Sequence, residues 1–530
     1  MRNDPTNKFF ASILSFLLFG LGLHHSCLLA GPLTEPQLQT EIESLRQVRI
    51  KHFIETRSSV LGKLPSPAEQ AKTQVDFRKQ FMGRRPRSVS DAEKKRALDL
   101  YTHVTFYLPT RSGRATFPLG ITGAHLREMR GQSAVTVVAV DEDSLAEGAL
   151  KVGDIIVGAF GHIFPEDDDP RIPLGYALAE AQTKTNKGIL TLNVVRSDEL
   201  TEARIDVGVQ GNYSSTWPYG CNKSSAIVDA ATSYIVSNIE AEKLDVFYDT
   251  LFLMGTGRHD ALEAVRRRLY TMREKENLGF GGLNSWKNGY SLVTLAEFYL
   301  LTGDSAVIPP MKKLVKVLSN GQMDCGSWGH SCPPGGYGAV NNVGLVCFMG
   351  LLLAREAGIE IDSEVMTRSV RFFGRGIGTF TPYGDHTYYS PRLWRYLPAS
   401  DNGSSSMSAL NFYLLGAPDL ARRTARQPCY QYRTRLAGHA ARIFTISWGP
   451  LGSVLAPKEE FHMFMNNLIW YFELSRQRDG SMTPLAGGWC PGTGSIALSL
   501  TLPRKKLRLL GAEKSVFAMK PPEGLTEARQ

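Results

Sequence analysis

Apolar residues recur at helical spacing through most of the chain beyond residue 211. Leu, Val, Ala and Phe side chains return every three or four positions, which places them on one side of a helix. Loops rich in glycine separate these stretches. The pattern predicts a large all-helical region, with helices at 224–241, 244–254, 260–274, 292–301, 306–318, 343–356, 363–373, 406–415 and 458–474.

The glycine-rich loops indicate that these helices form repeated pairs. Gly281, Gly326, Gly384, Gly438 and Gly480 mark five such loops, which follow one another at intervals of about 40 to 60 residues. Each interval is long enough for two helices and their turns. We therefore expect a loose repeat of helical hairpins.

Between residues 118 and 210 the pattern changes to short strands. The segments are rich in β-branched residues and are bounded by turn signals. The expected strands are 134–140, 154–160 and 188–196, and two brief helices are expected between them at 143–150 and 173–183. This order predicts a small β-rich unit in which residues 135–140 and 155–157 are buried.

Two motifs in this unit resemble those of PDZ domains. Pro118-Leu119-Gly120-Ile121 places a glycine between apolar residues, and Leu150 to Ile156 reads LKVGDII. The resemblance implies a sheet edge that accepts a peptide strand and backbone amides that bind a terminal carboxylate. Leu119, Gly120 and Ile121 would then contact a peptide or a protein C-terminus. An insert at 162–170 could close this groove, and the unit would then only pack against its neighbour.

The helical region resembles the α/α toroid of terpene cyclases, prenyltransferase β subunits and several polysaccharide-degrading enzymes. Gln322 to Trp328 and Gln477 to Ser481 look like degenerate copies of the Gln-x-x-Gly-x-Trp element of the cyclases. The resemblance implies a toroid at 211–512 but no activity. The aspartate-rich cyclase motif is missing there, and adjacent Asp324 and Cys325 replace the Asp-x-Cys zinc pair of the prenyltransferases.

The expected fold class is therefore multidomain α+β, with a small β-rich PDZ-like module followed by a large all-α (α/α) toroid. The whole arrangement also looks like a family of secreted bacterial proteins of unassigned function. Resemblance thus gives an architecture and leaves the activity open.

The first thirty residues have the pattern of a signal peptide. Arg2 and Lys8 precede an apolar run from Phe9 to Leu23, and Ala30-Gly31 offers a small-residue cleavage site. The run is shorter than the roughly 20 residues that span a bilayer. We expect a secreted or periplasmic protein without a transmembrane helix beyond the signal. An uncleaved anchor and a lipid on Cys27 are the alternatives.

Charge is unevenly distributed along the 530 residues, whose formal net charge is +9. Most of the excess lies in 31–117, where a polar, helix-prone sequence predicts a basic helical arm. Ser90 and Glu93 resemble the capping box of a helix that begins at Asp91. The remainder is nearly balanced, so we expect no specific nucleic-acid partner. Residues 513–530 are predicted to form a polar tail.

Cysteines and acidic residues give little support for a metal site. Six cysteines follow the signal and allow up to three disulfides, but no CxxC or HExxH motif occurs. His330 with Asp324 and Cys332 is a weak zinc candidate, and the acidic run Glu166 to Asp169 is a weak calcium candidate. No metal or other cofactor is expected.

Candidate catalytic residues lie in the glycine-rich loops. In a toroid, the loops that precede the inner helices surround one mouth and present helix N-termini to it. Asp324, Asp385, His386 and His439 are ionisable residues in these loops. A carboxylate beside a histidine can fix the tautomer that a general base requires. The alternative is structural, with aspartates that cap turns and histidines that are hydrogen-bonded.

Carbohydrate-directed binding or cleavage at the toroid mouth is the leading functional hypothesis. Aromatic residues in the same loops could pack on sugar rings, and His386, Tyr388, Arg392 and Asn402 are of the types that a lyase uses. Paired carboxylates would instead serve hydrolysis. If the protein is an enzyme, a polysaccharide lyase or hydrolase is expected rather than a terpene cyclase. The alternative is a non-enzymatic scaffold that binds a peptide or protein.

Overall fold

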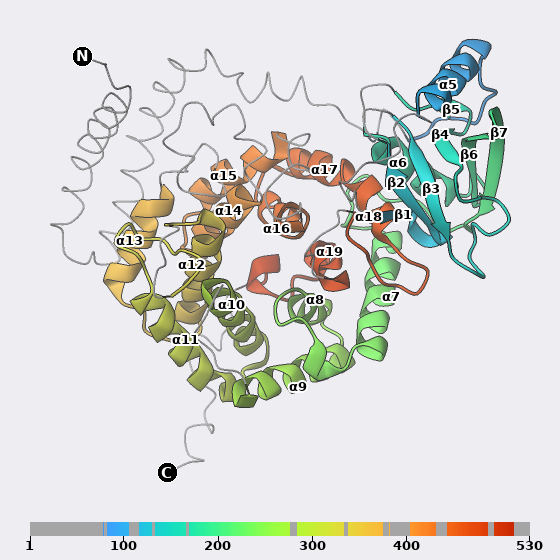
Figure 1. Ribbon diagram of the computed structural model, residues 1–530. Coiled ribbons are helices and arrows are strands. Elements are labelled where there is room, and N and C mark those ends of the chain that lie inside the picture. The colour runs from blue at the N-terminus through green and yellow to red at the C-terminus, as the bar shows by residue number, and fades with distance from the viewer. Residues whose placement is uncertain are drawn as a thin grey trace, which may run out of the picture.

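The computed structural model describes residues 78, 82–104, 116–129, 133–165, 169–275, 284–332, 338–374, 381, 403–430, 443–485 and 492–513. A small antiparallel sheet near the N-terminus adjoins a large ring of helices (Figure 1). The expected multidomain α+β fold class is confirmed. The predicted signal peptide and most of the predicted tail lie outside the described residues.

The sheet module, defined here as residues 116–211, is built on seven described strands in an antiparallel sheet. The strand order is β1-β2-β3-β4-β6-β7, and β5 pairs with β4. The strands are β1 (Phe117–Pro118), β2 (Ala124–Glu128), β3 (Val135–Val140), β4 (Ile155–Ala159), β5 (His162–Ile163), β6 (Ile189–Arg196) and β7 (Glu199–Asp206). Residues 143–150 form turns, so the helix predicted there is wrong.

Helices cover both faces of the sheet. Helix α6 (Arg171–Ala181) packs on one face, and α5 (Asp91–Val104) packs on the other. Side chains of β4 alternate between the two faces of the sheet. Ile155 and Val157 belong to a small apolar cluster that includes Ala97 of α5, whereas Ile156 belongs to the main core. Because β4 is buried on both sides, its sequence is a continuous apolar run.

The predicted capping box opens α5. The Ser90 backbone N–H donates to Glu93 Oε2 over 3.1 Å, and the Glu93 N–H donates to Ser90 Oγ over 3.4 Å. Part of the predicted basic arm is therefore an ordered helix on the sheet module.

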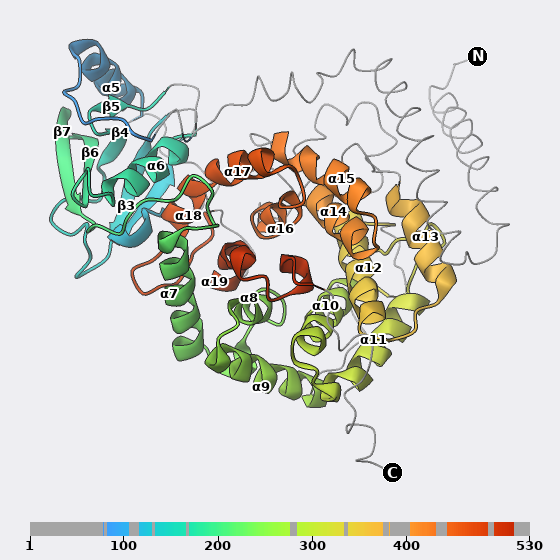
Figure 2. The same cartoon turned by 180° about the vertical axis from the view of Figure 1, so that it is seen from behind.

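The ring has two concentric layers of helices (Figures 1 and 2). The outer helices are α7 (Asn222–Asn238), α9 (His259–Lys275), α11 (Ile308–Asn320), α13 (Ser363–Phe373), α15 (Pro418–Tyr430), α17 (Lys458–Asn466) and α18 (Ile469–Ser475). The inner helices are α8 (Tyr248–Thr256), α10 (Asn284–Thr302), α12 (Asn341–Glu356), α14 (Ser404–Leu414), α16 (Ile443–Ser453) and α19 (Thr493–Ala497). The expected helical hairpins follow one another around the ring.

Helix α16 was not predicted because glycine and proline interrupt its pattern. It contains Gly449, Pro450 and Gly452, which ordinarily disfavour a helix interior. A β-carbon on Gly452 would lie 2.2 Å from the Ser406 main-chain oxygen of α14. Glycine at this position therefore allows two inner helices to approach closely.

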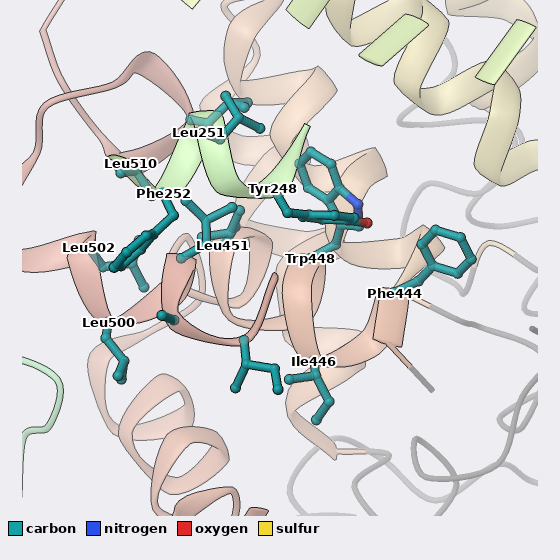
Figure 3. Packing of buried hydrophobic residues seen from close by; sticks show 14 of the residues in the cluster. Tyr248, Leu251, Phe252, Phe444, Ile446, Trp448, Leu451, Leu500, Leu502 and Leu510 are labelled. Carbon is teal, nitrogen blue, oxygen red and sulfur yellow. The ribbon is translucent and has the colours of Figure 1, made fainter. Parts of the chain in front are cut away.

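Apolar side chains from the inner helices fill the centre of the ring at one level. Phe252 of α8 and Leu451 of α16 belong to the same buried cluster as Leu500 and Leu502 of the 3-10 helix η9 (Leu498–Arg504) (Figure 3). All four of these side chains are almost completely buried.

The sheet module rests against the ring through α18. Helix α18 packs on α6, on β1 and on the 3-10 helix η1 (Gly120–Thr122). The Arg171 guanidinium lies over the rings of Phe117 and Trp470, at 6.0 and 5.9 Å from their centroids. Among the described residues, no helix has the length and apolar character needed to cross a membrane.

Candidate functional site

An aromatic cluster lies at the rim where the inner helices begin. We define the rim cluster as Phe247, Tyr248, Trp286, Tyr290, Phe444 and Trp448. These residues come from the first two turns of α8, α10 and α16 or directly precede them. Figure 3 shows Tyr248, Phe444 and Trp448 on this side of the buried core.

Several rings of the cluster stack with nearly parallel planes. Trp286 lies 5.4 Å from Phe444 with an interplanar angle of 14°, and 6.1 Å from Tyr290 with an angle of 13°. Phe247 stacks on Tyr290 at 4.3 Å. Trp286 and Phe247 are only half-buried, whereas Tyr290 and Trp448 are buried. The cluster therefore has a fixed base and a partly exposed aromatic face.

Hydrogen bonds hold the rings in place. The Tyr248 and Tyr290 hydroxyls are 2.9 Å apart, and Trp448 Nε1 donates to the Tyr290 hydroxyl over 3.1 Å. Trp286 Nε1 donates to His330 Nδ1 over 2.9 Å, so His330 carries its proton on Nε2 when neutral. Burial raises the pKa of the Tyr248 hydroxyl well above its usual range, which keeps this hydroxyl neutral.

Amide and hydroxyl groups occupy the same level of the inner helices. Asn288 of α10, Ser408 of α14, and Thr445 and Ser447 of α16 all lie in the first two turns of their helices and are buried. Among the described residues, Asn288 Nδ2 and the three hydroxyl oxygens have no hydrogen-bond partner. Buried polar groups usually form hydrogen bonds, so these four atoms could pair with water or with the polar groups of a ligand.

Two carboxyl groups adjoin the cluster, and both cap helices. Asp245 Oδ1 accepts from the backbone N–H groups of Phe247 and Tyr248 over 3.0 and 2.6 Å. Asp249 Oδ1 accepts from the Gly494 N–H over 3.0 Å, which joins the first inner helix to the last. Burial, and then the charge of Asp245, raise the pKa of Asp249 to about 6. The sequence offered no sign of this pair, because its role depends on closure of the ring.

The sequence-predicted catalytic residues are placed only in part. Asp324 is exposed in the loop between α11 and α12. Asp385, His386 and His439 lie outside the described residues. The structure therefore does not place these four residues together.

The weak zinc candidate does not have the geometry of a metal site. His330 Nδ1 accepts from Trp286, and Cys332 Sγ lies 3.1 Å from Ser285 Oγ. No group of three or more His, Cys, Asp or Glu residues able to hold a metal ion occurs in the described part of the chain. Cys221, Cys332 and Cys347 are buried free thiols, so three disulfides do not form.

The residues expected to contact a peptide lie at the interface with the ring. Leu119 is fully buried, and Ile121 is 6% exposed. Gly120 has a φ of +56°, and the space beside it is occupied by Leu178 of α6 and Glu473 of α18. The groove between η1 and α6 is thus covered by α18. A peptide has no access to Leu119 or Gly120 in this arrangement.

A buried polar network lies behind this interface. Glu473 contacts Lys223 Nζ at 2.8 Å and Arg476 Nη1 at 3.0 Å. It also accepts from the Tyr213 hydroxyl over 2.6 Å and from Gln182 Nε2 over 2.7 Å. Burial alone would raise the pKa of Glu473, but the charges of Arg476 and Lys223 outweigh burial and hold this pKa at about 2. Glu473 is therefore ionised.

The fold and these sites define a class of protein with a sheet module docked on a double ring of paired helices. A family model described as a domain of unknown function, DUF6288, matches residues 224–511. This match covers more than half of the chain, and the chain belongs to that family. It spans most of the helical ring, including the rim cluster. No curated protein and no solved structure matches the chain.

Proposed function

We propose that the rim cluster binds carbohydrate. The observation that carries this proposal is the near-parallel stack of Trp286 on Phe444 and Tyr290, with a partly exposed face. Aromatic faces provide rigid apolar area for the C–H face of a sugar ring. A few polar groups placed among aromatic walls then fix the ligand's orientation.

The buried amide and hydroxyl groups support a polar ligand rather than a hydrocarbon. Asn288 and Thr445 carry unsatisfied donors or acceptors at the level of the aromatic stack. Ligand hydroxyl groups that reached them would satisfy these atoms, whereas a hydrocarbon would leave them unpaired at a cost. This favours carbohydrate over a prenyl substrate.

Cleavage would require ionisable groups in addition to this binding surface. Asp245 and Asp249 are engaged in helix caps, so the loop residues Asp324, Asp385, His386 and His439 are our candidates for general acid or base. If the protein is an enzyme, we propose that these residues cleave the bound carbohydrate.

We also propose that the sheet module is PDZ-like and that the ring is related to the α/α toroids. The Leu119-Gly120-Ile121 motif directly before β2 and the flanking helix α6 support the first assignment. The alternating inner and outer helices support the second. Because α18 covers the groove, we favour a structural role for the module over peptide capture in that groove.

The experiment that tests carbohydrate binding compares Trp286→Ala with Trp286→Phe. Cello-, xylo-, chito- and oligogalacturonide oligosaccharides are titrated into the purified protein in a calorimeter. We expect one of them to bind. Trp286→Ala should weaken it about tenfold or more through loss of the aromatic face, whereas Trp286→Phe should retain most of the affinity.

Binding and turnover are separated by a second set of variants. His386→Ala or His439→Ala should reduce cleavage of the bound oligosaccharide by about a hundredfold or more without changing the melting temperature. If no oligosaccharide in the panel binds, or if Trp286→Ala binds as well as the parent, the carbohydrate proposal is wrong. Binding without cleavage would leave a carbohydrate-binding protein.

A further inference from the structure

A second pocket lies between the sheet module and the ring, away from the rim cluster. Its volume is about 560 Å³, which is within the usual range for small-ligand sites. Its walls come from η1, from α7 and from the segment 476–481 that follows α18. The pocket is thus formed only when the module is docked on the ring.

The pocket is electropositive. Lys223, Arg476 and Arg478 line it, and no Asp or Glu is among the described residues that line it. Lys223 and Arg476 share one carboxylate, that of Glu473. Glu473 therefore balances one of the two basic side chains, and burial lowers the pKa of Lys223.

Arg478 adds a further positive charge at the pocket. Its Nη1 donates to the main-chain oxygen of Asp143 over 3.3 Å, and its side chain is exposed. Among the described residues, Arg478 forms no salt bridge. A carboxylate in the pocket would give the Arg478 guanidinium a charged acceptor, in addition to its long hydrogen bond to the neutral main-chain oxygen of Asp143.

Much of the remaining lining is apolar. Ile121, Leu145 and Val207 face the pocket from the sheet module, and Ala226 and Ile227 line it from α7. An inorganic anion would leave these side chains against water. A ligand with both a negative charge and a short aliphatic group would contact both walls.

We propose that this pocket binds an aliphatic carboxylate. The carboxylate contacts Arg476 and Arg478, and the aliphatic group packs on Ile121, Leu145 and Val207. The last residue of a polypeptide and a short free branched-chain acid both carry this chemistry. The site is separate from the groove that α18 covers, and it does not depend on carbohydrate binding at the rim cluster.

Titration calorimetry with three probes tests the proposal on the full chain. The probes are acetyl-Ala-Ala-Val with a free C-terminus, the same peptide with a C-terminal amide, and 3-methylbutanoate. We expect at least one of the two acids to bind and the amide to bind about tenfold more weakly or not at all. If the peptide acid binds more tightly than 3-methylbutanoate, the ligand is the C-terminus of a polypeptide. If the two affinities are equal, the ligand is a free acid.

Two variants locate the binding in this pocket. Arg478→Ala should weaken the acid about tenfold, since the side chain is exposed and its loss should not affect folding. Ala226 is exposed on α7 and lines the pocket, so Ala226→Trp should block it. Ser225 is also exposed on α7 but does not line the pocket, so the Ser225→Trp variant should bind the acid normally.

Three results would overturn the proposal. They are no binding of either acid at about 10 mM, equal binding of the amide, and unchanged affinity in Ala226→Trp. Oligosaccharide binding is measured on the same variants. Loss of acid binding with intact oligosaccharide binding would show that the two sites are independent.

Discussion

The main-chain oxygen of Glu473 lies 2.5 Å from the place where a β-carbon on Gly120 would stand. Glu473 belongs to the last outer helix of the ring, and Gly120 belongs to the sheet module. Gly120 also has a φ of +56°, a conformation that favours glycine. The module can dock on the ring this closely only because residue 120 has no side chain.

Gly120→Ala should therefore destabilise the protein more than an ordinary glycine substitution. We expect a loss of roughly 2 to 4 kcal/mol from the positive φ together with overlap against Leu178 and Glu473. Gly148→Ala is the matched control, because Gly148 has a φ of +76° with no atom within 4 Å of the added β-carbon. It should cost about 1 kcal/mol. If urea denaturation showed the same loss of stability for Gly120→Ala and Gly148→Ala, the close contact at Gly120 would be contradicted.

Removal of the shared carboxylate should disrupt the interface between module and ring. Glu473→Ala leaves Lys223 and Arg476 buried without their counter-charge, and we expect a loss of roughly 3 to 5 kcal/mol in the free energy of unfolding. Glu364→Ala breaks the partly exposed pair with Arg368 and should cost at most about 1 kcal/mol. A similar small cost for both variants would mean that the network contributes little.

Asp249 should make the protein less stable as the pH rises. Its pKa is raised from 3.8 to about 6, so the folded state favours the protonated form. The stabilisation that comes from protonated Asp249 is roughly 3 kcal/mol. It is fully present below about pH 4 and is lost as the pH rises through about 6. Asp249→Asn cannot ionise and keeps an oxygen for the Gly494 N–H. Its stability relative to the parent should rise between pH 4 and 7, and parallel stability curves would refute this.

Export remains a prediction of the N-terminal sequence. The short apolar run and the small residues at Ala30-Gly31 lead us to expect a mature chain that begins near Gly31. Expression in a host with a secretory pathway, followed by N-terminal sequencing of the exported protein, measures this directly. An exported chain that retains Met1 would show that the segment is not cleaved.

Much of the fold was predictable because local pattern and final environment agree. The amphipathic helix at 363–373 was predicted at its observed bounds, and Asp362 caps it by accepting a hydrogen bond from the Glu364 backbone N–H. The strand Ile189–Arg196 was predicted to within one residue. By contrast, α16 was not predicted, because Gly449, Pro450 and Gly452 interrupt its helical pattern.

The candidate sites depend on contacts between distant segments. Trp286 and Phe444 stack although they are far apart in the sequence, and Ile121 shares a pocket with Arg478 of the ring. No local pattern encodes such pairs, because each is created by the curvature of the helix repeat or by docking of the module.

The sequence by itself determined the division into a β-rich segment and a helical repeat, because hydrophobic periodicity responds to local backbone geometry. Tertiary structure alone decided that α18 covers the groove beside Gly120 and that aromatic residues from α8, α10 and α16 meet at one rim. The physical reason is that burial and charge pairing depend on which surfaces meet in space. Those surfaces are set only when the ring closes through Asp249 and Gly494 and the module docks on it.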